Sequence, residues 1–330
     1  MTTPGYDTIT HGAAIGSVEP RHPVAVAGTD RASFLHGLLT NDITSLTPGT
    51  GCYAAWLTPQ GRMLTDMHVL QSASMMLLDL PADSAAATLS RLERFLFSED
   101  VQLQSLAGSL AGVWVHGPAA ADALTQVFVS ASGLRDWPDY RHEQMEYQGE
   151  PASVARIDQL GVPGYCVYLE ASRESSFIAA LERAGAARVD AASLDAARIE
   201  AGYPVFGRDM TDDTIPLEAS IEHRAISFSK GCYVGQEVII RVMHRGHGRV
   251  ARRLVGLGFG EAQVPPGAVL HAGDREIGKV TSAARSPVSG TVALGYVHRD
   301  FTAPGTTVEA RVEGTPVPGT VTRGHLTTGA

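Results

Sequence analysis

Residues 228–237 read FSKGCYVGQE and gather residue types that the rest of the chain uses sparingly. Cys232 is one of three cysteines in 330 residues, and Lys230 is one of two lysines. Gly231 and Gly235 would let the backbone pass close to a neighbouring segment or a ligand. The apolar run VIIRV that follows indicates that the segment leads into a helix or a strand.

Cys232 has two interpretations. If a helix begins nearby, its free amide groups form an anion site to which Lys230, Arg241 and Arg245 add positive charge. A cysteine in such a setting has a lowered thiol pKa and is reactive. Alternatively, Cys232 is a small core residue and the glycines only allow tight packing. The motif holds no second cysteine, so we do not expect a dithiol redox cycle within it.

The composition is that of an ordinary protein of two or three domains, with 44% hydrophobic and 18% charged residues. A net charge of −9 argues against a protein that binds mainly through the phosphate backbone of nucleic acid, so no direct nucleic-acid partner is expected. Three scattered cysteines favour neither a disulfide framework nor a zinc site, and we expect no metal. Without a signal-peptide pattern or an apolar run of ~18 residues, the sequence predicts a cytoplasmic protein that does not enter membranes.

Helix-like and strand-like segments alternate through the first part of the chain, which predicts an α+β arrangement. Residues 22–28 have the pattern of a strand, residues 84–97 that of a helix, and TPQGR (58–62) that of a turn between two strands. Beyond Arg249, short strand-like runs alternate with Gly, Pro, Asp and Ser, a pattern typical of a β-barrel or sandwich. We therefore expect a boundary near residue 248, with an α+β region at 1–247 and a barrel domain at 248–330.

The segment SLDAARIEAGYP (193–204) predicts a short helix capped by Ser193. Glu200 then lies in the last turn, where the helix dipole opposes a carboxylate, so a partner is expected. A carboxylate can accept two parallel N–H bonds from a ligand with adjacent amino and ring N–H donors. Arg198, Arg208 or solvent could serve as the partner instead.

Asp66 lies just beyond the TPQGR turn, a common location for a functional carboxylate. The segment VMHRGHGRVARR (242–253) carries two histidines three residues apart without a third metal ligand at a sensible spacing. Its arginines favour a solvated basic edge, which could still hold a polyanionic tail.

Together these segments resemble the folate-binding YgfZ family, relatives of the glycine cleavage T-protein (aminomethyltransferase). The resemblance covers almost the whole chain and rests on GTDRASFLHGLLTNDI, TPQGRMLTD, RIEAGYPVFGRD, IPLEASI and IGKVTSAARSP. KGCYVGQE (230–237) is the motif that distinguishes the YgfZ branch from authentic T-proteins. The resemblance implies a three-lobed ring, with two interleaved α+β lobes around a folate channel and a C-terminal β-barrel.

Tetrahydrofolate is the cofactor that the resemblance implies. The family's R-x-E-x-G glutamate, which holds the pterin ring, falls on Glu200. The T-protein's catalytic carboxylate falls in GRMLTDMHV, where that family tends to carry two acidic residues and this chain has Thr65 and Asp66. If Thr65 stands at the catalytic position, the chain lacks the charged group that aminomethyl transfer uses in that family.

The function that the resemblance implies is support of iron–sulfur proteins. In this interpretation the chain is a tetrahydrofolate-binding accessory factor for the assembly or maintenance of iron–sulfur enzymes, which are its transient clients and include tRNA-thiolating ones. Cys232 is its central residue, although a single motif cysteine is unlike a stable cluster site. The alternative is a folate-dependent aminomethyltransferase or demethylase acting on a small amine. A third possibility is a folate-sensing module without thiol chemistry.

Overall fold

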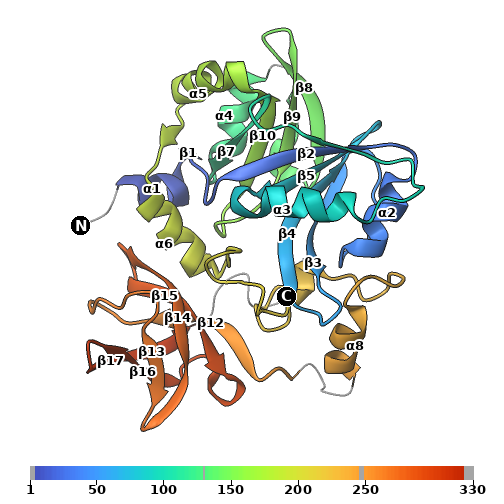
Figure 1. The fold of residues 1–330 in the computed structure, drawn as a ribbon. Helices are drawn as coiled ribbons and strands as arrows, with labels where there is room; N and C mark the ends of the chain where they lie inside the picture. The colour runs from blue at the N-terminus through green and yellow to red at the C-terminus, as the bar shows by residue number, and fades with distance from the viewer. Residues whose placement is uncertain (1–3, 129–130, 245–248, 323–330) are drawn as a thin grey trace.

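The computed structural model describes residues 4–128, 131–244 and 249–322, which form two β-sheets with flanking helices and a closed β-barrel (Figure 1). The first sheet has the strand order β3-β4-β5-β2-β6, and the second has the order β11-β1-β7-β10-β9-β8. β1 belongs to the second sheet although the strands of the first sheet follow it in sequence, so the two α+β lobes are interleaved. The expected α+β fold with a C-terminal barrel is confirmed.

The first sheet consists of β2 (Arg21–Ala27), β3 (Thr50–Leu57), β4 (Met63–Gln71), β5 (Met76–Pro81) and β6 (Gln102–Ser105). The second consists of β1 (Ala14–Ile15), β7 (Leu110–His116), β8 (His142–Tyr147), β9 (Glu150–Arg156), β10 (Gly164–Glu170) and β11 (Ala187–Arg188). The barrel closes in the order β12 (Arg252–Gly258), β15 (Gly290–His298), β14 (Arg275–Ser286), β13 (Val269–Ala272), β16 (Thr307–Val312) and β17 (Thr315–Thr322).

The α-helices are α1 (Pro4–His11), α2 (Arg31–Leu38), α3 (Ala82–Glu93), α4 (Ala120–Val127), α5 (Glu174–Arg183), α6 (Ala191–Ala201), α7 (Glu222–Ala225) and α8 (Gln236–His244). Within the described ranges, no helix has the length and apolar character needed to cross a membrane.

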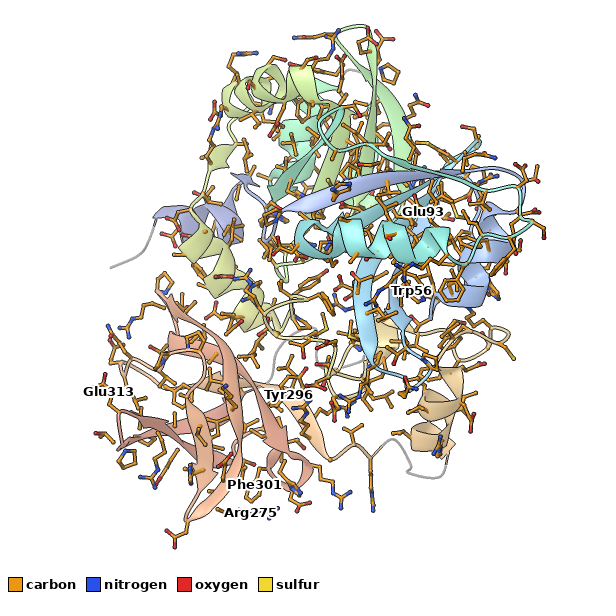
Figure 2. All side chains as sticks on the ribbon, viewed as in Figure 1. Trp56, Glu93, Arg275, Tyr296, Phe301 and Glu313 are labelled. Atoms are coloured by element: carbon orange, nitrogen blue, oxygen red, sulfur yellow. The ribbon has the colours of Figure 1, made fainter. Side chains whose placement is uncertain are left out.

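The two sheets lie face to face because their strands alternate between two cores. In β7, Val113 and Val115 pack with α4 and α5, whereas Trp114 points the other way and joins Leu70 and Leu77 of the first sheet. The opposite face of the first sheet, which includes Trp56 (Figure 2), packs against α2 and α3. The inner faces of the two sheets therefore pack together in one buried cluster.

The glycine-rich motif ends where α8 begins, at Gln236. Gly235 has φ +85°, and a Cβ placed there would lie 2.5 Å from the carbonyl oxygen of Thr58 in the β3–β4 turn. Only glycine fits this close approach. Gly231 is different, because a Cβ there would meet nothing closer than His36 Nε2 at 3.9 Å. The predicted tight packing therefore applies to Gly235 and not to Gly231.

The barrel is joined to α6 through Arg198, whose side chain is 1% exposed. Its guanidinium donates to Asp209 Oδ2 (2.8 Å) and to Ser282 Oγ on β14 (2.8 Å). Asp209 also accepts at its backbone oxygen from Tyr296 on β15 (3.0 Å; Figure 2). The domain boundary expected near residue 248 lies outside the described residues, and the first barrel strand begins at Arg252.

Candidate functional site

Thr65 and Asp66 are neighbours on β4 and point to opposite faces of the first sheet. The Thr65 hydroxyl lies 2.9 Å from the Ser84 hydroxyl at the start of α3, on the outer face. Asp66 is on the inner face, where the Tyr53 hydroxyl donates to its Oδ2 at 2.5 Å. Of the two residues at the end of TPQGRMLTD, Asp66 is therefore the one that faces the second sheet.

Asp66 belongs to a buried group of charges on this inner face. Arg21 Nη1 lies 2.7 Å from Glu19 Oε1 and 3.9 Å from Asp66 Oδ1, and Arg21 Nε lies 3.6 Å from Asp79 Oδ2. Burial raises the pKa of Glu19 to about 7; Arg21 opposes this shift and Asp66 reinforces it. Burial also raises the pKa of Asp79, with Arg21 again opposing. We refer to Glu19, Arg21, Tyr53, Asp66 and Asp79 as the inner charge cluster.

Aromatic rings and a second guanidinium close one side of this cluster. The Arg224 guanidinium carbon lies 4.5 Å from the ring centroid of Tyr53 and 4.1 Å from that of Tyr203. His68 Nδ1 lies 3.0 Å from the Tyr140 hydroxyl. Burial, with the positive charges of Arg21 and Arg224 nearby, holds the pKa of His68 well below its usual range, so this imidazole is neutral at pH 7.

Four buried polar atoms around the cluster make no hydrogen bond: Asp66 Oδ1, Asp79 Oδ1, Arg21 Nε and Arg224 Nη2. A buried group without a partner costs about 1–3 kcal/mol, and more when it is charged. Their concentration in one place, with both signs of charge, fits a site that completes its hydrogen bonds with a polar ligand.

Glu200 lies in the last turn of α6, as the sequence predicts, but the helix begins earlier than expected. Asp190 is the N-cap and accepts from the backbone N–H of Ser193 at 2.7 Å, so Ser193 is in the first turn instead. The Tyr6 hydroxyl of α1 donates to Glu200 Oε2. Burial and this bond raise the pKa of Tyr6 to about 12.

The arginines proposed as alternative partners of Glu200 are engaged elsewhere. Arg198 and Arg208 both form ion pairs with Asp195, and Arg198 also binds Asp209. Glu200 instead lines a cavity of about 570 Å³ between α6, α1 and the barrel strands β12 and β15. Among the described residues, no hydrogen bond or ion pair connects Glu200 to Asp66.

Lys230 and Cys232 are adjacent in the motif but have different surroundings. The Lys230 ammonium is buried and donates to the carbonyl oxygens of His36, Leu39 (2.7 Å) and Asn41 (3.1 Å), at the end of α2 and just beyond it. Burial lowers the pKa of Lys230 to about 8, with Asp42 opposing. The Cys232 side chain is exposed. The lysine expected to supply charge to a ligand or thiol is thus bound to backbone oxygens.

The remaining predicted cations lie at the surface or outside the described residues. Arg241 is exposed on α8, with its Nη2 3.7 Å from Glu237 Oε1. Arg245 lies outside the described residues. The anion site predicted from Lys230, Arg241 and Arg245 stays a prediction. In the part of the chain that the structure describes, no group of three His, Cys, Asp or Glu side chains is arranged to hold a metal.

The sequence motifs do not include Glu19, Arg21, Tyr53 or Arg224. Glu19 and Arg21 are two residues apart, just before and at the start of β2, and Tyr53 and Arg224 come from distant segments. One signal could have found Tyr53: the TPQGR turn fixes the register of the β3–β4 hairpin, which pairs Ala55 with Asp66 and places Tyr53 on the same face. The other three require the tertiary structure.

Comparisons with known proteins agree with this architecture. Residues 6–230 match the GCVT N-terminal domain, and residues 252–326 match the Glycine cleavage T-protein C-terminal barrel domain. The crystal structure of glycine cleavage system aminomethyltransferase T from Bartonella henselae superposes with a TM-score of 0.86 at 24% identity, over 99% of this chain and 91% of that one. At that identity the likeness concerns the fold.

Similar sequences carry related names. The chain is 26% identical to the aminomethyltransferase of Bacillus subtilis, over 93% of this chain and 85% of the relative. It is 29% identical to the aminomethyltransferase of Rubrobacter xylanophilus, over 88% of this chain and 78% of the relative. It is also 26% identical, over 92% and 69%, to a chloroplastic Arabidopsis thaliana protein whose name marks it only as a candidate transferase. None of these comparisons separates the YgfZ branch from the rest. By its fold and by the family models that match most of its length, this chain belongs to the glycine cleavage T-protein family, with both the GCVT N-terminal domain and the C-terminal barrel domain.

Proposed function

We propose that this chain binds tetrahydrofolate and moves a one-carbon unit, at the oxidation level of formaldehyde, between a small amine and the folate. This is the aminomethyltransferase alternative of the sequence analysis, and the names of the similar proteins favour it. The observation that carries the proposal is the state of Asp66. One carboxylate oxygen is fixed by Tyr53, and the other is buried without a hydrogen bond, ready to bind an N–H donor.

The chain's own residues supply binding, orientation and exclusion of water. Asp66 Oδ1 accepts a hydrogen bond from the protonated amine and holds it in place, while the Tyr53 hydroxyl prevents the carboxylate from rotating. The facing sheets keep bulk water away, which strengthens this charged interaction. When bound, tetrahydrofolate supplies the nitrogens that take up the carbon unit. The carbon keeps its oxidation level, so no oxidant is required.

Glu200 is proposed to accept the amino and ring N–H groups of the pterin. In support, Glu200 lines a cavity, and the hydroxyl group that donates to its carboxylate, that of Tyr6, is neutral. An arginine partner would instead have neutralised the carboxylate. A ligand with two adjacent N–H donors matches the two oxygens of this group.

The proposal is tested by incubating the protein with 5,10-methylenetetrahydrofolate, ammonium and dithiothreitol as a small thiol, and measuring the release of tetrahydrofolate. In this direction the methylene carbon leaves the folate and forms one bond to nitrogen and one to sulfur, and the two displaced protons return to the folate nitrogens. Asp66→Asn should lower the rate at least ~100-fold, the scale of a positioned carboxylate. Asp122→Asn, which removes an exposed surface carboxylate, is the matched control. Wild-type turnover no faster than the protein-free reaction, or full activity of Asp66→Asn, contradicts the proposal.

A second candidate function is favoured by Cys232. It is the exposed cysteine of the three, in the KGCYVGQE motif that resembles the YgfZ branch, and this accessibility fits a thiol that acts on other proteins. Here the chain would be a tetrahydrofolate-binding factor for iron–sulfur enzymes. The test is the activity of iron–sulfur enzymes in a deletion strain complemented with wild type or Cys232→Ser at matched levels. If both forms restore activity equally, or if deletion has no effect, this candidate fails.

A further inference from the structure

The inner charge cluster contains a carboxylate that the sequence motifs do not include. Strand β4 contains one acidic residue, Asp66, which faces inward, whereas its neighbour Thr65 points outward and hydrogen-bonds with Ser84. Glu19 comes from the loop between β1 and β2, and yet its Oε1 contacts the same guanidinium nitrogen, Arg21 Nη1, that lies 3.9 Å from Asp66 Oδ1. The two carboxylate oxygens are therefore at most about 7 Å apart, the sum of their distances to that nitrogen.

The position of Glu19 is well fixed and its side chain is shielded. The Ser17 hydroxyl donates to the Glu19 backbone oxygen, and the backbone N–H of Ala82 donates to the next carbonyl, that of Pro20, at 3.0 Å. The side chains of Glu19, Arg21 and Asp66 are 11%, 7% and 4% exposed. Charges buried this deeply interact through little water, so the charge state of one depends on the others.

Two buried carboxyl groups that share one guanidinium titrate as a unit. Glu19 is faced by Arg21 from β2, by Asp66 from β4 and by Asp79 from β5. Arg21 and the neighbouring Arg224 supply two positive charges against three carboxylates, so one proton retained on the group near neutrality balances its charge. Burial raises the pKa of both Glu19 and Asp79, but the Tyr168 hydroxyl donates to Asp79 Oδ2 at 2.8 Å and favours its ionised form, which leaves Glu19, with a pKa of about 7, to hold the proton. His68 remains neutral in this range and does not compete for the proton.

We infer that Glu19 acts together with Asp66 in this site and that it releases its proton when a cationic amine binds beside Asp66. A positive charge at Asp66 Oδ1 takes over the neutralisation of Asp66, which leaves Arg21 free to stabilise an ionised Glu19. The proton leaves to solvent and the charge of the group is conserved. Amine binding and proton release are then thermodynamically linked. The inference rests on the proposed function, because it requires an amine at Asp66.

A pH-stat titration of the unbuffered protein near pH 6.5 tests the inference. Methylammonium chloride is added at constant ionic strength, and sodium chloride and uncharged methanol serve as control additions. The wild type should release a substantial fraction of a proton per chain with methylammonium and none with the controls. The apparent affinity for methylammonium should rise as pH increases through about 7, since the proton and the amine oppose each other.

Glu19→Gln should bind methylammonium without releasing a proton, and its affinity should no longer depend on pH in this range. Asp139→Asn is the control for another proton source, because burial raises the pKa of Asp139 to about 6. A merely structural role for Glu19 would lower affinity without changing the proton count. If release persists in Glu19→Gln, or disappears in Asp139→Asn instead, the inference is wrong. If wild type binds methylammonium without release, only the role of Glu19 fails; if it does not bind methylammonium, the amine site fails with it.

Discussion

Replacing Lys230 by Met isolates what the motif lysine does. Methionine keeps most of the side-chain volume, so the change removes the ammonium and its three donors with little loss of packing. The carbonyl oxygens of His36, Leu39 and Asn41 would each lose this charged donor in a buried location. Counting ~1 kcal/mol for each carbonyl left without it, the free energy of unfolding should fall by roughly 3 kcal/mol.

The assay is urea unfolding followed by fluorescence, with the slope of the transition checked for constancy between variants. Lys279, the other lysine of the chain, is exposed on β14, and Lys279→Met should change the free energy of unfolding by less than ~0.5 kcal/mol. The pH dependence of Cys232 alkylation is the second measurement and should be unchanged in Lys230→Met. A stability loss no greater than that of Lys279→Met, or a large fall in the alkylation rate at equal stability, would refute the assignment of this lysine to the end of α2.

Three further predictions concern the carboxylates and the cysteines. Glu200→Gln should weaken tetrahydrofolate binding by about 1.5–3 kcal/mol, the scale of a charged hydrogen bond; unchanged affinity by calorimetry would exclude Glu200 as the pterin partner. Because the Glu19 pKa is raised from 4.5 to about 7 in the folded chain, its contribution to stability is present below pH 4.5 and is lost as pH rises to about 7. The free energy of unfolding should fall by on the order of 3 kcal/mol over this range, and Glu19→Gln should remove most of this dependence on pH. An equal change of unfolding free energy with pH in both proteins would contradict the prediction. Iodoacetamide should label Cys232 before Cys52 and Cys166, because burial raises the pKa of Cys52 to about 12 and that of Cys166 well above its usual range; mass spectrometry showing equal rates would contradict this order.

The sequence predicts the fold well because its signals are local and repeated. Hydrophobic alternation, the TPQGR turn and the Gly-rich spacing beyond Arg249 each specify elements that the structure contains. The differences lie at the ends of elements: the strand predicted at 22–28 is β2 at Arg21–Ala27, the helix predicted at 84–97 is α3 at Ala82–Glu93, and α6 begins before Ser193.

The candidate site is less accessible to sequence reasoning because its members meet only after the two sheets come together. Asp66 could be proposed from its turn, but its partner Arg21 and the neighbouring Glu19 are distant in sequence, and no pattern connects them. For Lys230 the motif is visible in the sequence, but the contacts of its side chain are not. Its motif suggested a charge placed for a ligand, whereas the distances assign its ammonium to backbone oxygens. The sequence shows which residues are unusual for this chain, but the groups that each side chain contacts are known only from the folded structure.

The buried Arg198 contact has a consequence for how the molecule can be divided. A fragment that ends before β12 would expose a guanidinium that now binds Ser282, and it would take from Asp209 the hydroxyl donors of Thr281 and Tyr296. The two segments that match separate family models are thus distinct as sequence patterns but share one set of hydrogen bonds. Arg198 and Glu200 lie two residues apart on the same helix. A chain without the barrel would therefore lose contacts that hold α6 in place, and with them part of what orients Glu200.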